Sequence, residues 1–191
     1  MQTLATRSPR LQRRIERSWL LDVLLAIAIG FGAALAKRYL DWSLGIPGHA
    51  GVGWIAVLVS GTLVNPRRGM AALAGVSMAV WGVPLGLGHS FGYNAMLYGS
   101  SAAALEAAIV LRLPISRWWG AAAGGAAVHL AKYSFIFGWA WFSGIVRHFE
   151  IYGLLAALRN HLVFGVAGGL VGWSVFAAGR RMAAHRRRSA S

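Results

Sequence analysis

The sequence predicts an all-α, polytopic membrane protein with six transmembrane helices and both termini in the cytoplasm. Three observations lead to this fold class. Hydrophobic residues make up 57% of the 191 residues and charged residues only 13%, and the mean hydropathy of +0.56 is higher than soluble domains usually have. Several apolar runs approach the about 20 residues that a helix needs to cross a bilayer. Basic residues cluster between these runs, with 19 Lys and Arg against 5 Asp and Glu.

A basic segment comes before the first apolar run. The run that follows it is too long for the core of a signal peptide, so residues 1–18 are predicted to be a retained cytoplasmic tail. The first span is expected over residues 19–39. Within it Ala28, Gly32 and Ala36 recur every four residues on one helix face, a pattern typical of helices that pack closely against a partner in lipid.

Proline, glycine and arginine mark the turns between the later runs, as in Asn65-Pro-Arg-Arg-Gly69. The later spans are expected at 49–64, at 70–85, from after Asn94 to about Leu111, at 118–144 and at 152–178. The chain is therefore divided into the basic tail, a transmembrane domain over residues 19–179, and a second basic tail over residues 180–191.

The distribution of cations gives the orientation. Fourteen of the 19 lie in the two tails and in the turns that contain Arg67 and Arg112, whereas four lie on the opposite side and Lys132 lies within a span. Because cytoplasmic loops carry the excess of Lys and Arg, both termini are placed in the cytoplasm of a multi-pass protein of the inner (plasma) membrane. The expected partners of these cations are anionic lipid headgroups and not nucleic acid.

Lys132 lies near the middle of the fifth span, about 16 Å below its external end. A lysine at the bilayer centre costs at least about 2.5–3.5 kcal/mol, so a compensating group or ligand is expected. His129 lies nearly one turn deeper on the same face and Trp139 two turns above. Asn160 in the sixth span is the expected polar counterpart. These residues indicate either a ligand cavity open to the outside or a structural polar cluster.

Other polar groups are less distinctive. His89, Tyr93 and Asn94 are expected at the external mouth, where they would bind a ligand or anchor the helix at the interface. Glu106 lies only about 9 Å from the inner end of its span, too far to pair directly with Lys132. It is left open between a cavity residue and a partner of an inner-side arginine. Close helix packing is the favoured explanation for four glycines of the sixth span: Gly165, Gly168, Gly169 and Gly172.

Enzymatic signatures are weak. The sequence has no HExxH, GxSxG or Walker A motif and no cysteine, and no two of its six histidines are spaced i, i+4. We therefore expect no catalytic residues, no metal site and no cofactor, and predict that the protein is not an enzyme.

The order of these features resembles the membrane-embedded substrate-binding (S) components of energy-coupling factor (ECF) vitamin transporters. The shared features are six short spans, an inside N-terminus, a first external loop rich in Gly and Pro, and the Gly61–Gly69 turn. The pattern covers most of residues 20–180 and is most specific in residues 56–75. There the family often has a Gly-Pro-Lys/Arg-x-Gly-like turn, from which the turn here departs by one residue.

The resemblance implies capture of a small water-soluble vitamin or vitamin precursor on the external side, with the first loop as a lid. It also implies a coupling transmembrane subunit, contacted by the face of Ala28, Gly32 and Ala36, and two cytoplasmic ATPases. Ligand contacts in the family commonly come from the first loop and spans four to six, which matches the group around Lys132. The aromatic and histidine content would suit a thiamine-like or biotin-like ring.

Two other functions stay open. A small integral-membrane enzyme or enzyme subunit acting on a lipid-like substrate would need a carboxylate cluster on the cytoplasmic side, for which Glu106 alone is thin support. An unrelated transporter, a channel-like protein or a membrane-assembly subunit would also fit the composition.

Overall fold

The computed structural model describes residues 9–40, 48–87, 90–143 and 151–189, and in these ranges the chain forms helices and no strands. The all-α prediction is therefore confirmed. The six helices are α1 (Pro9–Tyr39), α2 (Gly51–Val64), α3 (Met70–Gly82), α4 (Phe91–Val110), α5 (Trp118–Phe142) and α6 (Ile151–Ser189).

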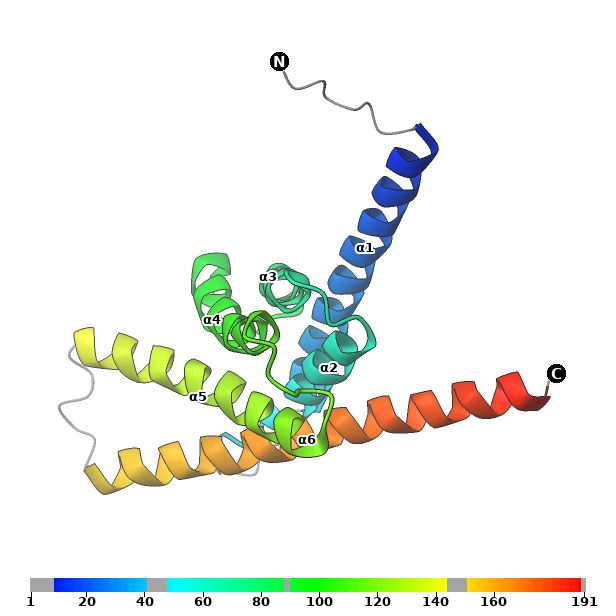
Figure 1. Cartoon of the computed structure of the whole chain (residues 1–191). Helices are drawn as coiled ribbons and strands as arrows, with labels where there is room; N and C mark the ends of the chain where they lie inside the picture. Colours follow the sequence, from blue (N-terminus) through cyan, green and yellow to red (C-terminus); the bar gives the residue numbers. More distant parts are fainter. Residues whose placement is uncertain (1–8, 41–47, 88–89, 144–150, 190–191) are drawn as a thin grey trace, which may run out of the picture.

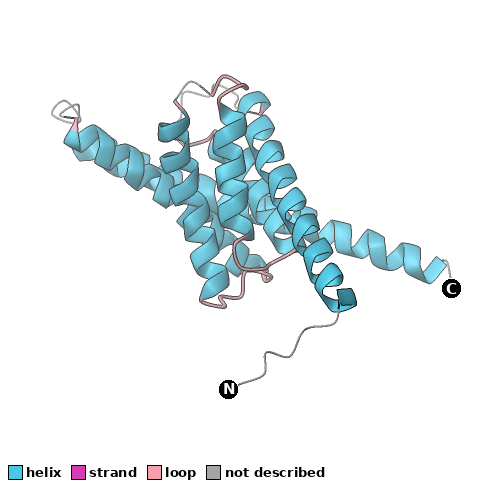
Figure 2. Ribbon diagram, turned by 90° about the horizontal axis from the view of Figure 1, so that it is seen from above, coloured by secondary structure: helices cyan, strands magenta, loops and turns pink. Residues whose placement is uncertain are grey.

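The six helices form a closed ring in the order α1, α3, α4, α5, α6 and α2, with α2 also touching α5 across the middle. The described parts of the connecting loops lie at the two ends of this bundle (Figure 2). Helices α5 and α6 form a hairpin that runs obliquely to the others, and the C-terminal part of α6 projects beyond the bundle (Figure 1).

The lengths of the helices differ widely. Two segments, Ser18–Tyr39 and Gly153–Ser189, are long and apolar enough to cross a membrane. Helices α2 and α3 have 14 and 13 residues, so each is roughly 20 Å long, shorter than the about 30 Å of a bilayer core. Helix α1 begins at Pro9 and α6 ends at Ser189, so both helices continue through the predicted tail boundaries.

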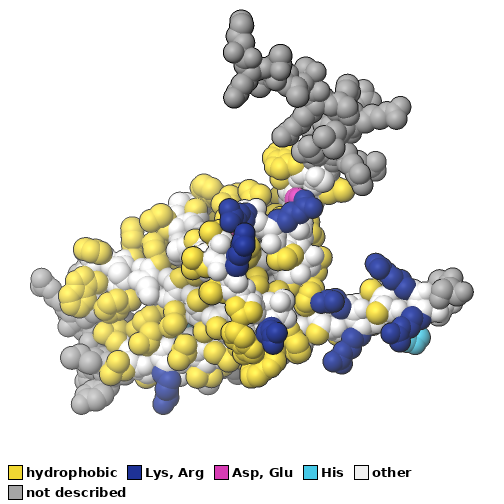
Figure 3. Space-filling model, viewed as in Figure 1, with side chains coloured by type: hydrophobic (Ala, Val, Ile, Leu, Met, Phe, Trp, Pro, Cys, Tyr) yellow, Lys and Arg dark blue, Asp and Glu magenta, His cyan; other side chains and the backbone are white. Residues whose placement is uncertain are grey.

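Apolar side chains cover much of the outside of the bundle (Figure 3). On α3, for example, Leu73, Val76 and Val80 are each about half exposed and follow one another along one face. A contiguous exposed apolar surface is unusual for a soluble monomer and marks a surface that contacts lipid or another protein.

Glycines allow the closest helix contacts. A Cβ atom at Gly165 would lie 2.7 Å from the carbonyl oxygen of Gly125 on α5, and one at Gly172 would lie 2.7 Å from the carbonyl oxygen of Ala56 on α2. Gly168 faces α2 and Gly169 faces α5 in the same way. The predicted role of the α6 glycines in close packing is confirmed, because larger side chains would force these backbones apart.

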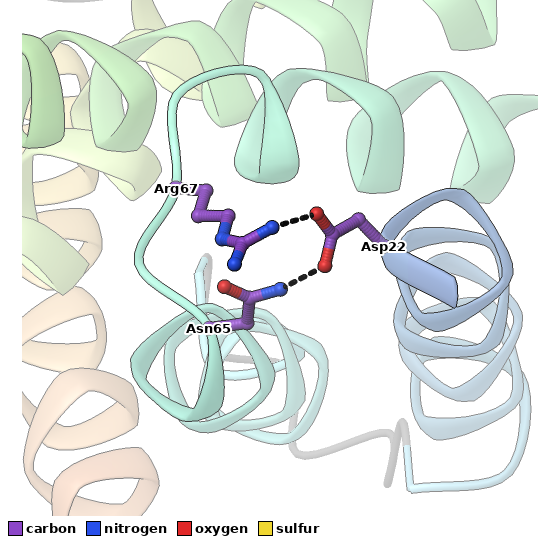
Figure 4. Close-up of polar contacts among 3 residues, drawn as sticks. All are labelled: Asp22, Asn65 and Arg67. Carbon is purple, nitrogen blue, oxygen red and sulfur yellow. Dashed lines mark hydrogen bonds and ion pairs between the residues drawn. The ribbon is translucent and has the colours of Figure 1, made fainter. Parts of the chain in front are cut away.

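Two carboxylates hold the turn between α2 and α3. Asp22 of α1 accepts hydrogen bonds from Asn65 Nδ2 at 2.6 Å and from Arg67 Nη1 at 2.5 Å (Figure 4). Glu106 of α4 accepts from the backbone N–H of Gly69 at 2.6 Å and of Ala71 at 3.2 Å. Glu106 thus caps the N-terminus of α3, where free N–H groups and the helix dipole favour an anion. This role is neither of the two considered from the sequence.

Candidate functional site

A polar cluster is buried where α5 and α6 meet. His129 and Lys132 of α5 and His161 of α6 are 0%, 9% and 8% exposed. The imidazole rings of the two histidines lie 4.5 Å apart, centroid to centroid. His129 Nδ1 lies 3.0 Å from the backbone carbonyl oxygen of His161, and His161 Nδ1 lies 2.8 Å from that of Ala157. Since a carbonyl oxygen only accepts, both rings donate from Nδ1, which directs each Nε2 away from these bonds.

Helix α2 supplies the aromatic wall of this cluster. The ammonium group of Lys132 lies 5.7 Å from the centre of the Trp54 ring, within the range of a cation–π interaction. The Trp54 ring also meets the rings of His129 and Tyr98 edge to face, at 6.3 and 5.7 Å. Aromatic faces thus provide part of the stabilisation that a buried ammonium group requires.

Two polar atoms of the cluster are buried without a hydrogen bond to any described residue. They are the donor Trp54 Nε1 and the ring atom His129 Nε2. With Nδ1 protonated, neutral His129 presents Nε2 as an acceptor. The cluster therefore offers a donor and an acceptor from facing helices, and leaving such groups unsatisfied costs about 1–3 kcal/mol each.

A glycine turn closes over the two histidines. A Cβ atom at Gly51 would lie 2.5 Å from His129 Nε2, and one at Gly48 would lie 3.2 Å from His161 Nδ1. Gly48 also has a φ of +91°, a conformation that other residues rarely adopt. Glycine is therefore required at both positions for the backbone to approach the rings. Residues 41–47 of the predicted lid lie outside the described residues.

Aromatic residues continue the α5 face beyond Lys132. The ring of Tyr93 on α4 packs edge to face against Phe135 at 5.4 Å and against Trp139 at 5.9 Å. Trp139 is 57% exposed, so this group extends from the cluster to the surface. Tyr133, next to Lys132, donates from its hydroxyl to the carbonyl oxygen of Leu154 at 3.0 Å and joins the two arms of the hairpin.

The structure brings some predicted site residues together and not others. His129 and Lys132 lie in one cluster, Trp139 contacts Tyr93, and Asn94 is buried beside Gly82 of α3. His89 lies outside the described residues.

The sixth-span residue in the cluster is His161 and not the predicted Asn160, which is half-buried. One residue along a helix rotates the side chain by about 100°, which accounts for the difference. The signal was present in the sequence, because His161 precedes Gly165 by four residues and shares its packing face. The sequence analysis also did not identify Trp54 as a site residue. Its neighbours in the sequence are small and apolar and do not indicate a site.

The predicted partner face of α1 is largely used within the chain. Ala36 is buried and lies near Gly53 of α2, and a Cβ atom at Gly32 would be 3.4 Å from Val57. Only Ala28 is exposed. Gly30 of α1 approaches α3 closely instead, because a Cβ atom there would overlap the backbone carbonyl oxygen of Ala74.

The groups available in the cluster are polar and aromatic. It combines one cation, two imidazoles tied to backbone carbonyls and an aromatic wall. In the part of the chain that the structure describes, no group of three His, Cys, Asp or Glu side chains is placed to hold a metal ion. The carboxylates of Asp22 and Glu106 both accept hydrogen bonds from the α2–α3 turn.

Comparisons with protein-family models, with curated proteins and with solved structures gave no match to this chain.

Proposed function

We propose that this chain is a multi-pass membrane protein that captures a small water-soluble vitamin, or a vitamin precursor, from the external side. In this proposal it acts as the substrate-binding component of an energy-coupling factor transporter, with a coupling transmembrane subunit and cytoplasmic ATPases. The observation that carries the proposal is the buried group of Lys132, His129 and His161 within apolar helices. Ionisable groups at such depth are retained in membrane proteins chiefly where they serve a function.

The positions of the cations support the orientation. The Asp22–Arg67 contact places the early part of α1 beside the α2–α3 turn. Trp173 Nε1 donates to the carbonyl oxygen of Ser116 at 2.9 Å, which places the later part of α6 beside the α4–α5 turn. In the sequence, arginines precede the apolar part of α1 and follow the apolar part of α6. Figure 3 shows Lys and Arg side chains concentrated along the projecting end of α6. This end of the bundle is the cytoplasmic one in our proposal.

The arrangement of the cluster supports a ligand with both polar and ring character. Lys132 and Trp54 Nε1 would donate hydrogen bonds to a carboxylate or carbonyl oxygen of the ligand, and His129 Nε2 would accept one from an amide N–H. The rings of Tyr93 and Trp139 would cover a flat ligand on the external side. Glu106, which was the sequence support for an enzyme acting on a lipid-like substrate, is bonded to the backbone at the start of α3.

The test is ligand binding by the purified protein in detergent or nanodiscs, measured calorimetrically across a panel of water-soluble vitamins and precursors. Lys132→Met keeps the length of the side chain but removes its charge, and Arg38→Met, at an exposed position at the external end of α1, is the control that removes one charge. We expect one member of the panel to bind the wild-type and control proteins, and Lys132→Met to weaken that binding at least about tenfold, which corresponds to about 1.4 kcal/mol. Equal binding by all three proteins, or none to any member, would contradict the proposal.

The coupling partners require a separate experiment. Affinity purification from mild-detergent extracts of the native membrane is expected to recover a second transmembrane subunit together with ATPase subunits. Recovery of the chain alone, from extracts in which ligand binding is intact, would contradict the coupled-transport part of the proposal. The substrate-capture part would stand.

A further inference from the structure

Helix α6 leaves the bundle obliquely (Figures 1 and 2). Two hollows flank it there. The larger, of about 590 Å³, lies between α6 and the C-terminal end of α2, and the smaller, of about 320 Å³, lies between α6 and the α4–α5 turn. Phe176 and Arg180 line both. Their volumes fall within the roughly 300–1,000 Å³ typical of small-molecule sites.

The two hollows have apolar floors and a cationic rim. Leu63 and Val64 of α2 and Val175 of α6 line the larger one. Arg180 and Arg181 border the smaller one, where both guanidinium groups are exposed. The guanidinium carbon of Arg180 lies 5.7 Å from the centre of the Phe176 ring, so the charged head projects from an aromatic base. An apolar cleft with arginines at its edge matches a molecule with an anionic head and an apolar tail.

The depth of this rim fits a lipid phosphate. Trp173, held to the carbonyl oxygen of Ser116 at 2.9 Å, is the type of residue that anchors a helix at the membrane interface. Arg180 follows seven residues later, about 10 Å further along the helix. The headgroup layer extends about 5–8 Å beyond the hydrocarbon core in each leaflet. Because α6 runs obliquely to the bundle (Figure 1), a distance of about 10 Å along its axis corresponds to a smaller depth in the membrane. Arg180 therefore reaches the phosphate level when Trp173 lies at the edge of the core.

We propose that these hollows bind one anionic phospholipid of the inner leaflet. Arg180 and Arg181 hold its phosphodiester through charge-assisted hydrogen bonds, and an acyl chain lies against Val64, Val175 and Phe176. The inference rests on the membrane location in the proposed function and concerns a site separate from the Lys132 cluster. The bound lipid fills the space between the departing α6 and the rest of the bundle and fixes the angle at which α6 leaves it.

The first test is native mass spectrometry of the full chain released from nanodiscs that contain equal amounts of phosphatidylglycerol and phosphatidylcholine. The variant is Arg180→Gln/Arg181→Gln, and the matched control is Arg186→Gln/Arg187→Gln, which removes the same charge further along the same helix. Because the double variant loses both cations that are proposed to hold the headgroup, it should retain phosphatidylglycerol at least about fivefold less than wild type. The control should stay within about twofold. Equal losses in both variants, or none in either, would overturn the site.

The second test uses the absence of cysteine from the sequence. An Ala184→Cys variant labelled with a fluorophore is placed in nanodiscs with brominated phosphatidylglycerol or brominated phosphatidylcholine, with and without soluble glycerol phosphate. We expect stronger quenching by the anionic lipid, unaffected by glycerol phosphate. Equal quenching by the two lipids would overturn the headgroup selectivity, and displacement by glycerol phosphate would show a soluble-phosphate site instead.

Vitamin binding measured on the same preparations separates the two proposals. Wild type and Arg180→Gln/Arg181→Gln are expected to bind the vitamin equally. Lipid retention without any vitamin binding would contradict the proposed function alone. Vitamin binding without selective lipid retention would contradict the lipid site alone, and a chain that does not enter nanodiscs would contradict both.

Discussion

Glu106 gives the most direct test of how the α2–α3 turn is held. Its carboxylate accepts two backbone N–H groups at the start of α3, at 2.6 and 3.2 Å. A hydrogen bond to a charged group contributes about 1.5–3 kcal/mol and the helix dipole about 0.3–1 kcal/mol. Because Glu106 is only half-buried and the two bonds share one carboxylate, we expect Glu106→Ala to lower the free energy of unfolding by about 2–4 kcal/mol.

The assay is thermal unfolding in detergent, followed by intrinsic tryptophan fluorescence. For a chain of this length 1 kcal/mol corresponds to about 2–4 °C in Tm, so Glu106→Ala should lower Tm by about 5–15 °C. Glu106→Gln keeps one acceptor oxygen and should lower it by about half as much. Asp22→Asn is the comparison, because its partner Arg67 is 61% exposed and an exposed ion pair contributes only about 0–1 kcal/mol.

The expected order of destabilisation is therefore Glu106→Ala, then Glu106→Gln, then Asp22→Asn. Ligand affinity should be the same in all three variants, because the cap lies away from the polar cluster. A Glu106→Ala protein that unfolds at the wild-type temperature but loses ligand binding would refute the capping role. It would indicate that Glu106 is a cavity residue.

Two further predictions follow from single contacts and a third from the proposed topology. Gly125→Ala should lower stability by about 1–3 kcal/mol in the same thermal assay, because its Cβ atom would lie 2.7 Å from Gly169 N. Gly138→Ala, where a Cβ atom would meet nothing within 4 Å, should be neutral, and equal effects of the two variants would argue against the close α5–α6 contact. Tyr133→Phe should cost about 0.5–1.5 kcal/mol through loss of its bond to a backbone carbonyl, and an unchanged Tm would show that bond to be dispensable. For the proposed topology, Ser90→Cys should react with a membrane-impermeant maleimide in intact cells and Arg68→Cys should not, and the reverse pattern would invert the orientation.

Helix positions could be predicted where turns are chemically marked. The expected runs at 49–64, 70–85 and 118–144 correspond to α2, α3 and α5 within a few residues, because proline and glycine stop helices locally. The pattern of Leu11, Ile15 and Trp19 allows either a short amphipathic helix or a disordered tail, and α1 includes these residues. The outer end of α6 was not predicted from hydropathy. Arginine is a good helix former, so both helices continue into the basic segments after the apolar pattern has ended.

The site was predictable only in part, because depth along a helix follows from residue count but the packed face depends on neighbours. His129 and Lys132 share a face by spacing alone, and both are in the cluster. Trp54 enters it because α2 crosses α5, which no local pattern encodes. The role of Glu106 depends on a contact with residues 35 and 37 positions away, and such long-range pairing is outside what periodicity can predict.

In the membrane setting of the proposed function, the short length of α3 has a consequence for the surrounding bilayer. Its exposed face of Leu73, Val76 and Val80 belongs to a helix only 13 residues long, whereas α6 on the other side of the ring is three times longer. In a bilayer this difference produces hydrophobic mismatch: lipids beside α3 must shorten, at a cost of fractions of a kcal/mol per Å, while α6 tilts. The protein would therefore deform the membrane unequally around its circumference, and its stability would depend on acyl-chain length most strongly on the α3 side.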